Sequence, residues 1–130
     1  VYAVDVQKDL LARLHKEASE THLHNIEIVL GNAEKLGGTR LKDGIADRIF
    51  ISNVLFQIED KDNFILEMKR LLRSGGKLVL VDWSTGVGVG PHSQMVVGPL
   101  EAAHLFINAG FTKISEFDAG DHHYGLVFSR

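Results

Sequence analysis

The strongest constraint on the fold is the alternation of short, β-branched apolar runs with longer amphipathic stretches. Strands are predicted at 1–6, 25–30, 46–52 and 77–83, and helices at 7–20, 60–73 and 99–109. The chain ends with two further predicted strands, 111–119 and 122–130, joined by a Gly-Asp turn. Strands that alternate with helices favour a parallel sheet covered on both faces. We therefore expect an α/β three-layer sandwich with a mainly parallel sheet and an antiparallel C-terminal strand.

Size and composition narrow the function classes. The 130 residues suit a single domain, 1–130, and the net charge of -3 argues against nucleic acid as the main partner. The sequence has no cysteine, which excludes disulfides, thiolate zinc sites and cysteine nucleophiles and fits a reducing cytoplasm. No apolar run approaches the ~18 residues that a membrane span requires, so none is predicted.

Polar residues follow three of the predicted strands, where ligands bind in doubly wound sheets. Asp5 ends the first strand, Gly31-Asn32-Ala33-Glu34 follows the second, and Ser52-Asn53 follows the third. A carboxylate can accept two hydrogen bonds from a ribose diol, and an amide can bind the edge of an adenine. Asp and Asn also favour helix caps and turns for local reasons. Both interpretations stay open at this stage.

Two other patterns in the sequence could indicate binding sites. The run Gly86–Gly90 has three glycines, but its spacing is G-x-G-x-G and Pro91 follows it in place of a helix, which favours a loop over the substrate side. His122 and His123 are adjacent, so on a strand they would point to opposite faces. With no cysteine and no H-E-x-x-H, no metal site is predicted.

Four motifs in the right order carry a resemblance to a known family. They are Val-Tyr-Ala-Val-Asp at 1–5, Gly-Asn-Ala-Glu-Lys-Leu at 31–36, the segment 43–55 from Asp-Gly-Ile-Ala-Asp to Ile-Ser-Asn-Val-Leu, and Leu-Leu-Arg-Ser-Gly-Gly-Lys-Leu at 71–78. Together they resemble class I S-adenosylmethionine (SAM)-dependent methyltransferases. Within these they resemble the type 11 branch, which includes ubiquinone and menaquinone biosynthesis methyltransferases. The resemblance implies a Rossmann-like sheet, SAM as cofactor and a small-molecule methyl acceptor.

The resemblance also implies roles for particular residues. Asp5 matches the acid that binds the SAM ribose hydroxyls, Asn32 and Ala33 match the pair beside the adenine, and Ser52 matches a residue near the methionine end. No catalytic residue is predicted, because the methyl carbon of SAM is already activated and the protein mainly has to align the reactants.

The sequence departs from the family at its N-terminal side. The family has a first strand and a Gly-x-Gly-x-Gly loop before the segment that matches Val1, and neither is found here. That strand lies between those matching 1–6 and 46–52, so we expect a partial domain with two open strand edges, which would favour self-association. We expect weak SAM binding by this chain alone. The alternatives are a non-catalytic remnant or, disfavoured by the absent G-x-G-x-x-G, a dinucleotide-dependent oxidoreductase domain.

Overall fold

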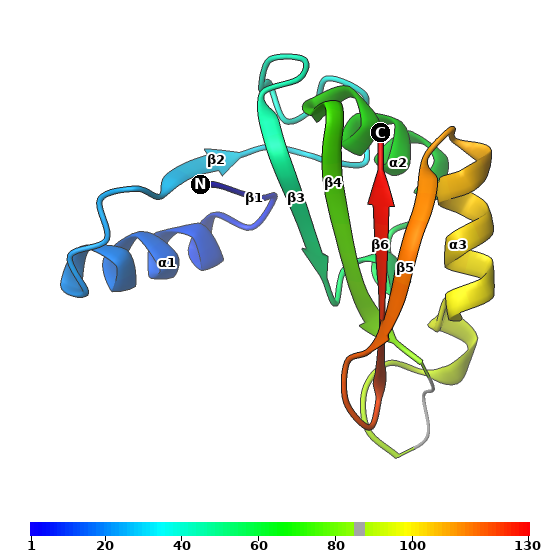
Figure 1. Cartoon of the computed structure of the whole chain (residues 1–130). Helices are drawn as coiled ribbons and strands as arrows, with labels where there is room; N and C mark the ends of the chain where they lie inside the picture. Colours follow the sequence, from blue (N-terminus) through cyan, green and yellow to red (C-terminus); the bar gives the residue numbers. More distant parts are fainter. Residues whose placement is uncertain (85–87) are drawn as a thin grey trace.

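The computed structural model describes residues 1–84 and 88–130 and follows the expected alternation of strands and helices (Figure 1). The strands are β1 (Tyr2–Asp5), β2 (Glu27–Leu30), β3 (Ala46–Ser52), β4 (Leu72–Trp83), β5 (Thr112–Asp118) and β6 (His123–Ser129). The helices are α1 (Lys8–Glu20), α2 (Lys61–Leu71) and α3 (Pro99–Asn108), with short 3-10 helices η1 (Leu55–Gln57) and η2 (Ser93–Met95). The predicted run Gly86–Gly90 lies partly outside the described residues.

Four of the strands form one sheet in the order β3-β4-β6-β5. β3 and β4 are parallel, and β6 is antiparallel to both of its neighbours, β4 and β5. Three strands of this sheet therefore run in one direction, with β6 inserted between two of them in the other. The predicted mainly parallel sheet with an antiparallel C-terminal strand is confirmed.

β1 and β2 form a separate two-stranded parallel sheet with Asp5 opposite Leu30. Within the described residues, β1 pairs only with β2, and β3 only with β4, so each presents one open edge. Figure 1 shows the β1–α1–β2 unit standing beside β3. The sheet is thus divided at the position where the resembled family has its first strand.

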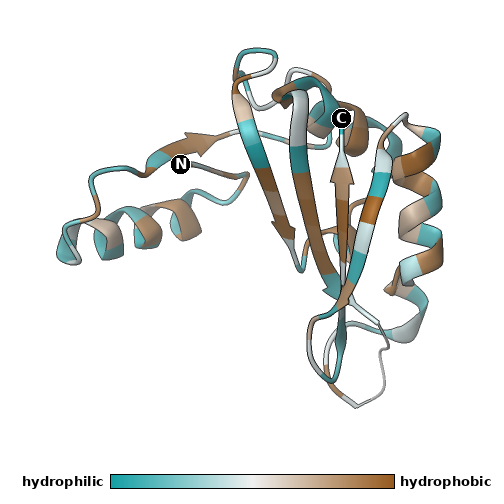
Figure 2. Ribbon diagram, viewed as in Figure 1, coloured by the Kyte–Doolittle hydropathy of each residue, from teal (hydrophilic) through white to brown (hydrophobic). Residues whose placement is uncertain are grey.

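The hydrophobic core belongs to the four-stranded sheet and to the helices α2 and α3 that pack on it (Figure 1). Its fully buried side chains include Leu78, Leu80, Phe106, Leu126 and Phe128. In Figure 2 the long apolar stretches lie on β4 and β6 of this sheet. By contrast, α1 is amphipathic and buries only Leu11 and Ala18. The chain therefore has one well-packed unit and one thinly packed unit.

The end of α2 differs from the sequence prediction. The helix was expected to reach residue 73, but it ends at Leu71, and β4 begins at Leu72. Leu72 is fully buried and pairs with Ala46 of β3, so tertiary burial ends the helix earlier than its pattern indicates. Gly75, with φ of 72°, lies in an irregular part of β4.

Candidate functional site

Asp5 is the last residue of β1, and its carboxylate accepts a hydrogen bond within the turn that leads into α1. Its Oδ1 accepts a hydrogen bond from the Gln7 amide at 2.8 Å. Its carbonyl accepts one from the Gly31 amide at 3.1 Å, which brings the loop after β2 against the end of β1. Asp5 therefore stabilises the turn before α1 without capping the helix, whose N-cap is Gln7, and within the described residues Oδ2 remains for a ligand.

Asn32 and Ala33 lie in that loop, which folds tightly on itself. Asn32 accepts a hydrogen bond from the Glu34 amide through Oδ1 at 2.8 Å, so its side-chain Nδ2 group is the remaining donor. A Cβ on Gly31 would lie 2.9 Å from the Cα of Thr39, closer than real Cβ atoms approach. Glycine at this position is what lets the loop pass so close to the next segment.

Glu67 of α2 accepts hydrogen bonds from the same loop and so attaches it to the core. Its carboxylate is fully buried and accepts hydrogen bonds from the Gly37 amide at 2.7 Å and from the Thr39 hydroxyl at 2.5 Å. Arg70, one turn further along α2, donates to Glu67 through Nε at 2.8 Å and forms an ion pair with Asp43. These five groups form a clamp, called here the Glu67 clamp, between the loop and the core.

The clamp shifts the pKa of Glu67 strongly. Burial alone would raise this pKa, but the hydrogen bonds from Arg70 and Thr39, helped by the Gly37 and Thr39 amides, lower it to about 2. The pKa of Arg70 is raised in turn, chiefly by its bond to Glu67. The sequence prediction missed this pair. Its signal was a carboxylate among the apolar positions of α2, three residues before an arginine.

Ser52 is the exposed last residue of β3 and pairs with Val81 of β4. The next residue, Asn53, has a left-handed backbone with φ of 55°, and its amide donates to the Val81 carbonyl at 3.0 Å. The buried carboxylate of Asp82 accepts the Leu55 amide through Oδ2 at 2.8 Å. Asp82 therefore fixes the turn that follows Ser52.

The structure brings Asp5, Asn32 and Ala33 to the carboxyl end of the β1–β2 sheet, whereas Ser52 ends a strand of the other sheet. A cavity of about 440 Å³ lies beside the loop after β2 and is lined by Val6, Lys8, Leu30, Gly31, Asn32, Lys35, Gly38 and Arg40, so Asn32 lines it whereas Asp5 and Ala33 do not. The Asn32 amide donor lies in this cavity, and the Asp5 carboxylate is next in the chain to Val6 of its wall. These two groups suit a purine edge and a ribose diol, so the residues present fit an adenosine group. That all four predicted residues line one rim stays a prediction.

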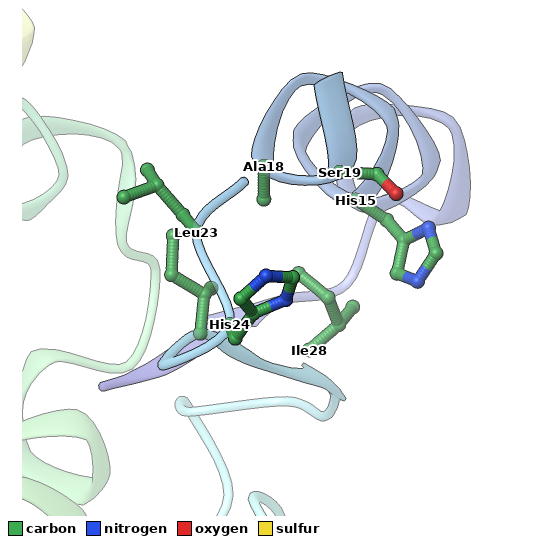
Figure 3. Close-up of a pocket in the computed structure, with 7 residues that line it drawn as sticks. His15, Ala18, Ser19, Leu23, His24 and Ile28 are labelled. Carbon is green, nitrogen blue, oxygen red and sulfur yellow. The ribbon is translucent and has the colours of Figure 1, made fainter. Parts of the chain in front are cut away.

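A second cavity, of about 230 Å³, lies between α1 and β2 (Figure 3). Figure 3 shows His15 on α1 and His24 before β2 at its wall. Within residues 1–84 and 88–130, no group of three or more metal-ligating side chains is present. None of the cavity-lining residues is a predicted site residue, so this cavity adds nothing to the site at Asp5.

The known sequences that match this chain are all methyltransferases. Residues 1–80 match a family model described as a methyltransferase domain. A demethylmenaquinone methyltransferase of Listeria monocytogenes is 31% identical over 84 residues, which are 65% of this chain and 34% of the relative. The ubiquinone/menaquinone biosynthesis C-methyltransferase UbiE of Hahella chejuensis is 40% identical over 60 residues, 46% of this chain and 23% of the relative. The chain thus spans about a third or less of these relatives' length.

Comparison with solved structures supports the fold. A SAM-dependent methyltransferase from Aquifex aeolicus superimposes with a TM-score of 0.88 at 23% identity, over 98% of this chain and 67% of that one. The [4+2]-cyclase SpnF superimposes with a TM-score of 0.85 at 15% identity, over 99% of this chain and 65% of that one. Because a cyclase shares the fold, the fold alone does not fix the reaction. Among the described residues, no helix has the length and apolarity needed to cross a bilayer.

Proposed function

Since this chain belongs to the class I SAM-dependent methyltransferase family, we propose that it is the cofactor-binding part of an enzyme that methylates a small molecule. The observation that carries the proposal is the carboxylate of Asp5 at the carboxyl end of β1, beside the Asn32 loop. SAM supplies an electrophilic methyl group on a sulfonium when it is bound. The chain's own task is to hold and orient the reactants.

Each proposed contact uses a group that the local structure leaves available. Asp5 Oδ2 binds the ribose diol, because Oδ1 already accepts the Gln7 amide. The Asn32 amide donates to the adenine edge, since its oxygen is taken by the Glu34 amide, and Ala33 packs on the ring. Ser52 contacts the methionine end from the end of β3.

The acceptor in this proposal is a ring of the reduced quinone type. The support is the name of the Listeria relative, a demethylmenaquinone methyltransferase. The net charge of -3 disfavours nucleic acid as the acceptor. The cysteine-free sequence fits a reaction in the cytoplasm.

We expect the chain by itself to bind SAM weakly and to show no measurable methyl transfer. Asp5 and Ser52 belong to two sheets that are not hydrogen-bonded to each other. The glycine loop of the family, which is not found in this sequence, would make two or three hydrogen bonds to SAM. Without them, at ~1–1.5 kcal/mol each, SAM binding would be weaker on the order of a hundredfold. The open edges of β1 and β3 would also pair with a second copy, because unpaired edges act as templates.

Calorimetric titration with SAM and S-adenosylhomocysteine tests the proposal. We expect a dissociation constant of roughly 100 μM or weaker, with binding lost in Asp5→Ala. The control is Asp9→Ala, which removes an exposed carboxylate in the first turn of α1 and should leave binding unchanged. Binding that survives Asp5→Ala would contradict the site. A low-micromolar isotherm that Asp5→Ala abolishes would show that the chain binds SAM in the ordinary way.

A further inference from the structure

The cavity beside the loop after β2 concentrates positive charge. Its lining includes three cationic side chains, Lys8, Lys35 and Arg40, and among the described residues it includes no acidic one. The whole chain, by contrast, carries a net charge of -3. Lys8 belongs to α1, whereas Lys35 and Arg40 belong to the loop, so the fold brings these charges together from separate segments. SAM has no anionic group at its adenosine end, so the proposed adenosine site does not account for them.

The three cations are not neutralised by acids of the chain. Within residues 1–84 and 88–130, none of them forms an ion pair. Glu34 is adjacent to Lys35, but its Oε2 accepts the amides of Glu59 and Asp60. Asp9 is adjacent to Lys8 on α1, and consecutive residues of a helix do not face each other. The positive charge of the cavity is therefore left for a ligand.

The Glu67 clamp fixes the backbone on both sides of Arg40. Thr39, the residue before it, donates its amide and its hydroxyl to Glu67. The carbonyl of Leu41, the residue after it, accepts a hydrogen bond from Arg70 Nη1 at 2.8 Å. Arg40 itself has a left-handed backbone with φ of 59°, which is sparsely populated by residues other than glycine and persists only where the surroundings hold it. Arg40 is thus a cation on a fixed backbone.

Local hydrogen bonds order the backbone at the two lysines as well. The Lys35 amide donates to the Asn32 carbonyl at 3.3 Å, and the Lys35 carbonyl accepts the Gly38 amide at 2.7 Å. Lys8 begins α1, directly after the turn in which the Asp5 carboxylate accepts a hydrogen bond. Because the backbone that carries the cations is ordered already, binding a ligand would cost mainly side-chain freedom.

A phosphate group matches this arrangement. Its oxygens accept charge-assisted hydrogen bonds, and a guanidinium group can bind two of them at once. The volume of about 440 Å³ lies within the roughly 300–1,000 Å³ that small-molecule sites occupy. The Asn32 amide and the apolar side chains of Val6 and Leu30 line the same cavity, so a purine has a polar partner and apolar walls beside the cations.

We propose that Lys8, Lys35 and Arg40 form an anion-binding site that takes a phosphate group, either free phosphate or the phosphate of an adenine nucleotide. A nucleotide phosphate on the ribose 2′ oxygen is next to the base, so it reaches the cations while the purine meets Asn32. That such a nucleotide competes with SAM rests on the proposed function. The binding of the phosphate group itself does not, because Asp5 takes no part in it.

The test is an NMR titration of the full chain that follows the amide signals of Gly31 and Gly38, which line the cavity. The probes are inorganic phosphate, adenosine and adenosine 2′-monophosphate. We expect inorganic phosphate to shift these signals saturably, and the nucleotide to bind about tenfold more tightly than adenosine. Both effects should weaken when the salt concentration rises from ~20 to ~200 mM, because salt screens exposed charges.

Matched variants test the cations. Lys35→Gln should weaken phosphate binding about threefold, and the triple variant with Lys8→Gln and Arg40→Gln added should abolish it. Lys42→Gln is the control, because Lys42 is an exposed lysine that does not line the cavity, and it should leave binding unchanged. The three substituted side chains are exposed, so an unchanged urea midpoint should show that the fold survives.

The outcomes separate the two sources of phosphate. Tighter binding of the nucleotide than of adenosine and of inorganic phosphate would identify a nucleotide as the ligand, whereas no advantage over inorganic phosphate would identify free phosphate. The absence of shifts with both phosphate-bearing probes, or shifts that persist in the triple variant, would overturn the proposal. Asp5→Ala should abolish SAM binding and leave phosphate binding intact, so failure of this site is distinguishable from failure of the proposed function.

Discussion

Two parts of the chain, the thinly packed first half (residues 1–45) and the well-packed second half (residues 46–130), both contain a β-α-β pattern but pack differently. In residues 46–83, the helix α2 lies on two long paired strands and joins a core completed by α3 and β6. In residues 1–30, the helix α1 lies on two four-residue strands and buries two side chains. Stability therefore resides mainly in the second half, while three of the four proposed cofactor contacts lie in or just after the first.

The comparison matters for function because the Glu67 clamp joins the two halves. The loop after β2 carries Asn32 and Ala33, and its amides at Gly37 and Thr39 are held by a carboxylate of the core. Glu34 adds a second tie, since its Oε2 accepts the Glu59 and Asp60 amides at 3.1 and 3.2 Å. The well-packed half thus positions the proposed adenine contacts, whereas Asp5 depends on its short sheet.

The largest expected contrast comes from the same truncation in each half. Leu126→Ala removes a fully buried side chain from the core and should lower the free energy of unfolding by about 3–5 kcal/mol. Leu11→Ala should lower it by only about 1 kcal/mol, because α1 can open locally without global unfolding. Urea titrations would measure both. Equal losses would show that the halves unfold as one cooperative unit with shared packing.

Removing the carboxylate of Glu67 should have the next largest effect on the free energy of unfolding. Glu67→Ala leaves Arg70 and two backbone amides without their buried partner, which should cost about 3 kcal/mol. Glu20→Ala is the control, because its ion pair with Lys16 is solvent-exposed and should contribute less than about 0.5 kcal/mol. Urea titrations would compare the two variants. If Glu67→Ala lowers the free energy of unfolding by less than about 1 kcal/mol, the Glu67 clamp does not contribute substantially to stability.

Acid should weaken the clamp without any mutation. The pKa of Glu67 is about 2 in the folded chain against an ordinary 4.5, so the folded state favours the charged form. This stabilisation is complete above the unfolded pKa and is lost as pH falls from about 4.5 towards 2, by on the order of 3 kcal/mol. Urea midpoints measured across this window should fall less steeply in Glu67→Gln. An identical pH profile in wild type and variant would exclude Glu67 as the source.

The sequence predicted the elements well where local pattern and tertiary burial agree. The strand 46–52 was placed with its observed bounds, and both strands of the C-terminal hairpin were placed within one residue of their bounds at all four ends. The end of α2 was misplaced, because the burial of Leu72 overrides helical periodicity and no local signal records it. The split of the sheet followed from the resemblance and not from the pattern of the residues.

The site was harder to predict than the fold. Asp5, Asn32, Ala33 and Ser52 stand at the ends of their strands or just after them, as expected, because strand order places polar residues at carboxyl ends. Glu67 and Asp82 were missed, since a buried carboxylate on an apolar face is recognisable only once its partners are known. His123 was considered only as a metal ligand, and nothing in the sequence indicates that its Nε2 is buried without a partner among the described residues.

The smallest expected change in folding comes from the open edge of the well-packed half. Phe50 is 69% exposed on β3, so Phe50→Lys should alter the free energy of unfolding by less than about 0.5 kcal/mol. A charged side chain on an edge strand opposes pairing with another chain, so self-association should fall. Sedimentation velocity across a concentration series would show wild type shifting to a larger species and Phe50→Lys remaining a monomer.

Tyr2→Lys on β1 is the matched change at the other edge. Because β1 belongs to the thinly packed half, this variant should reduce association less than Phe50→Lys does. A wild-type chain that stays monomeric at every concentration would refute pairing through either edge.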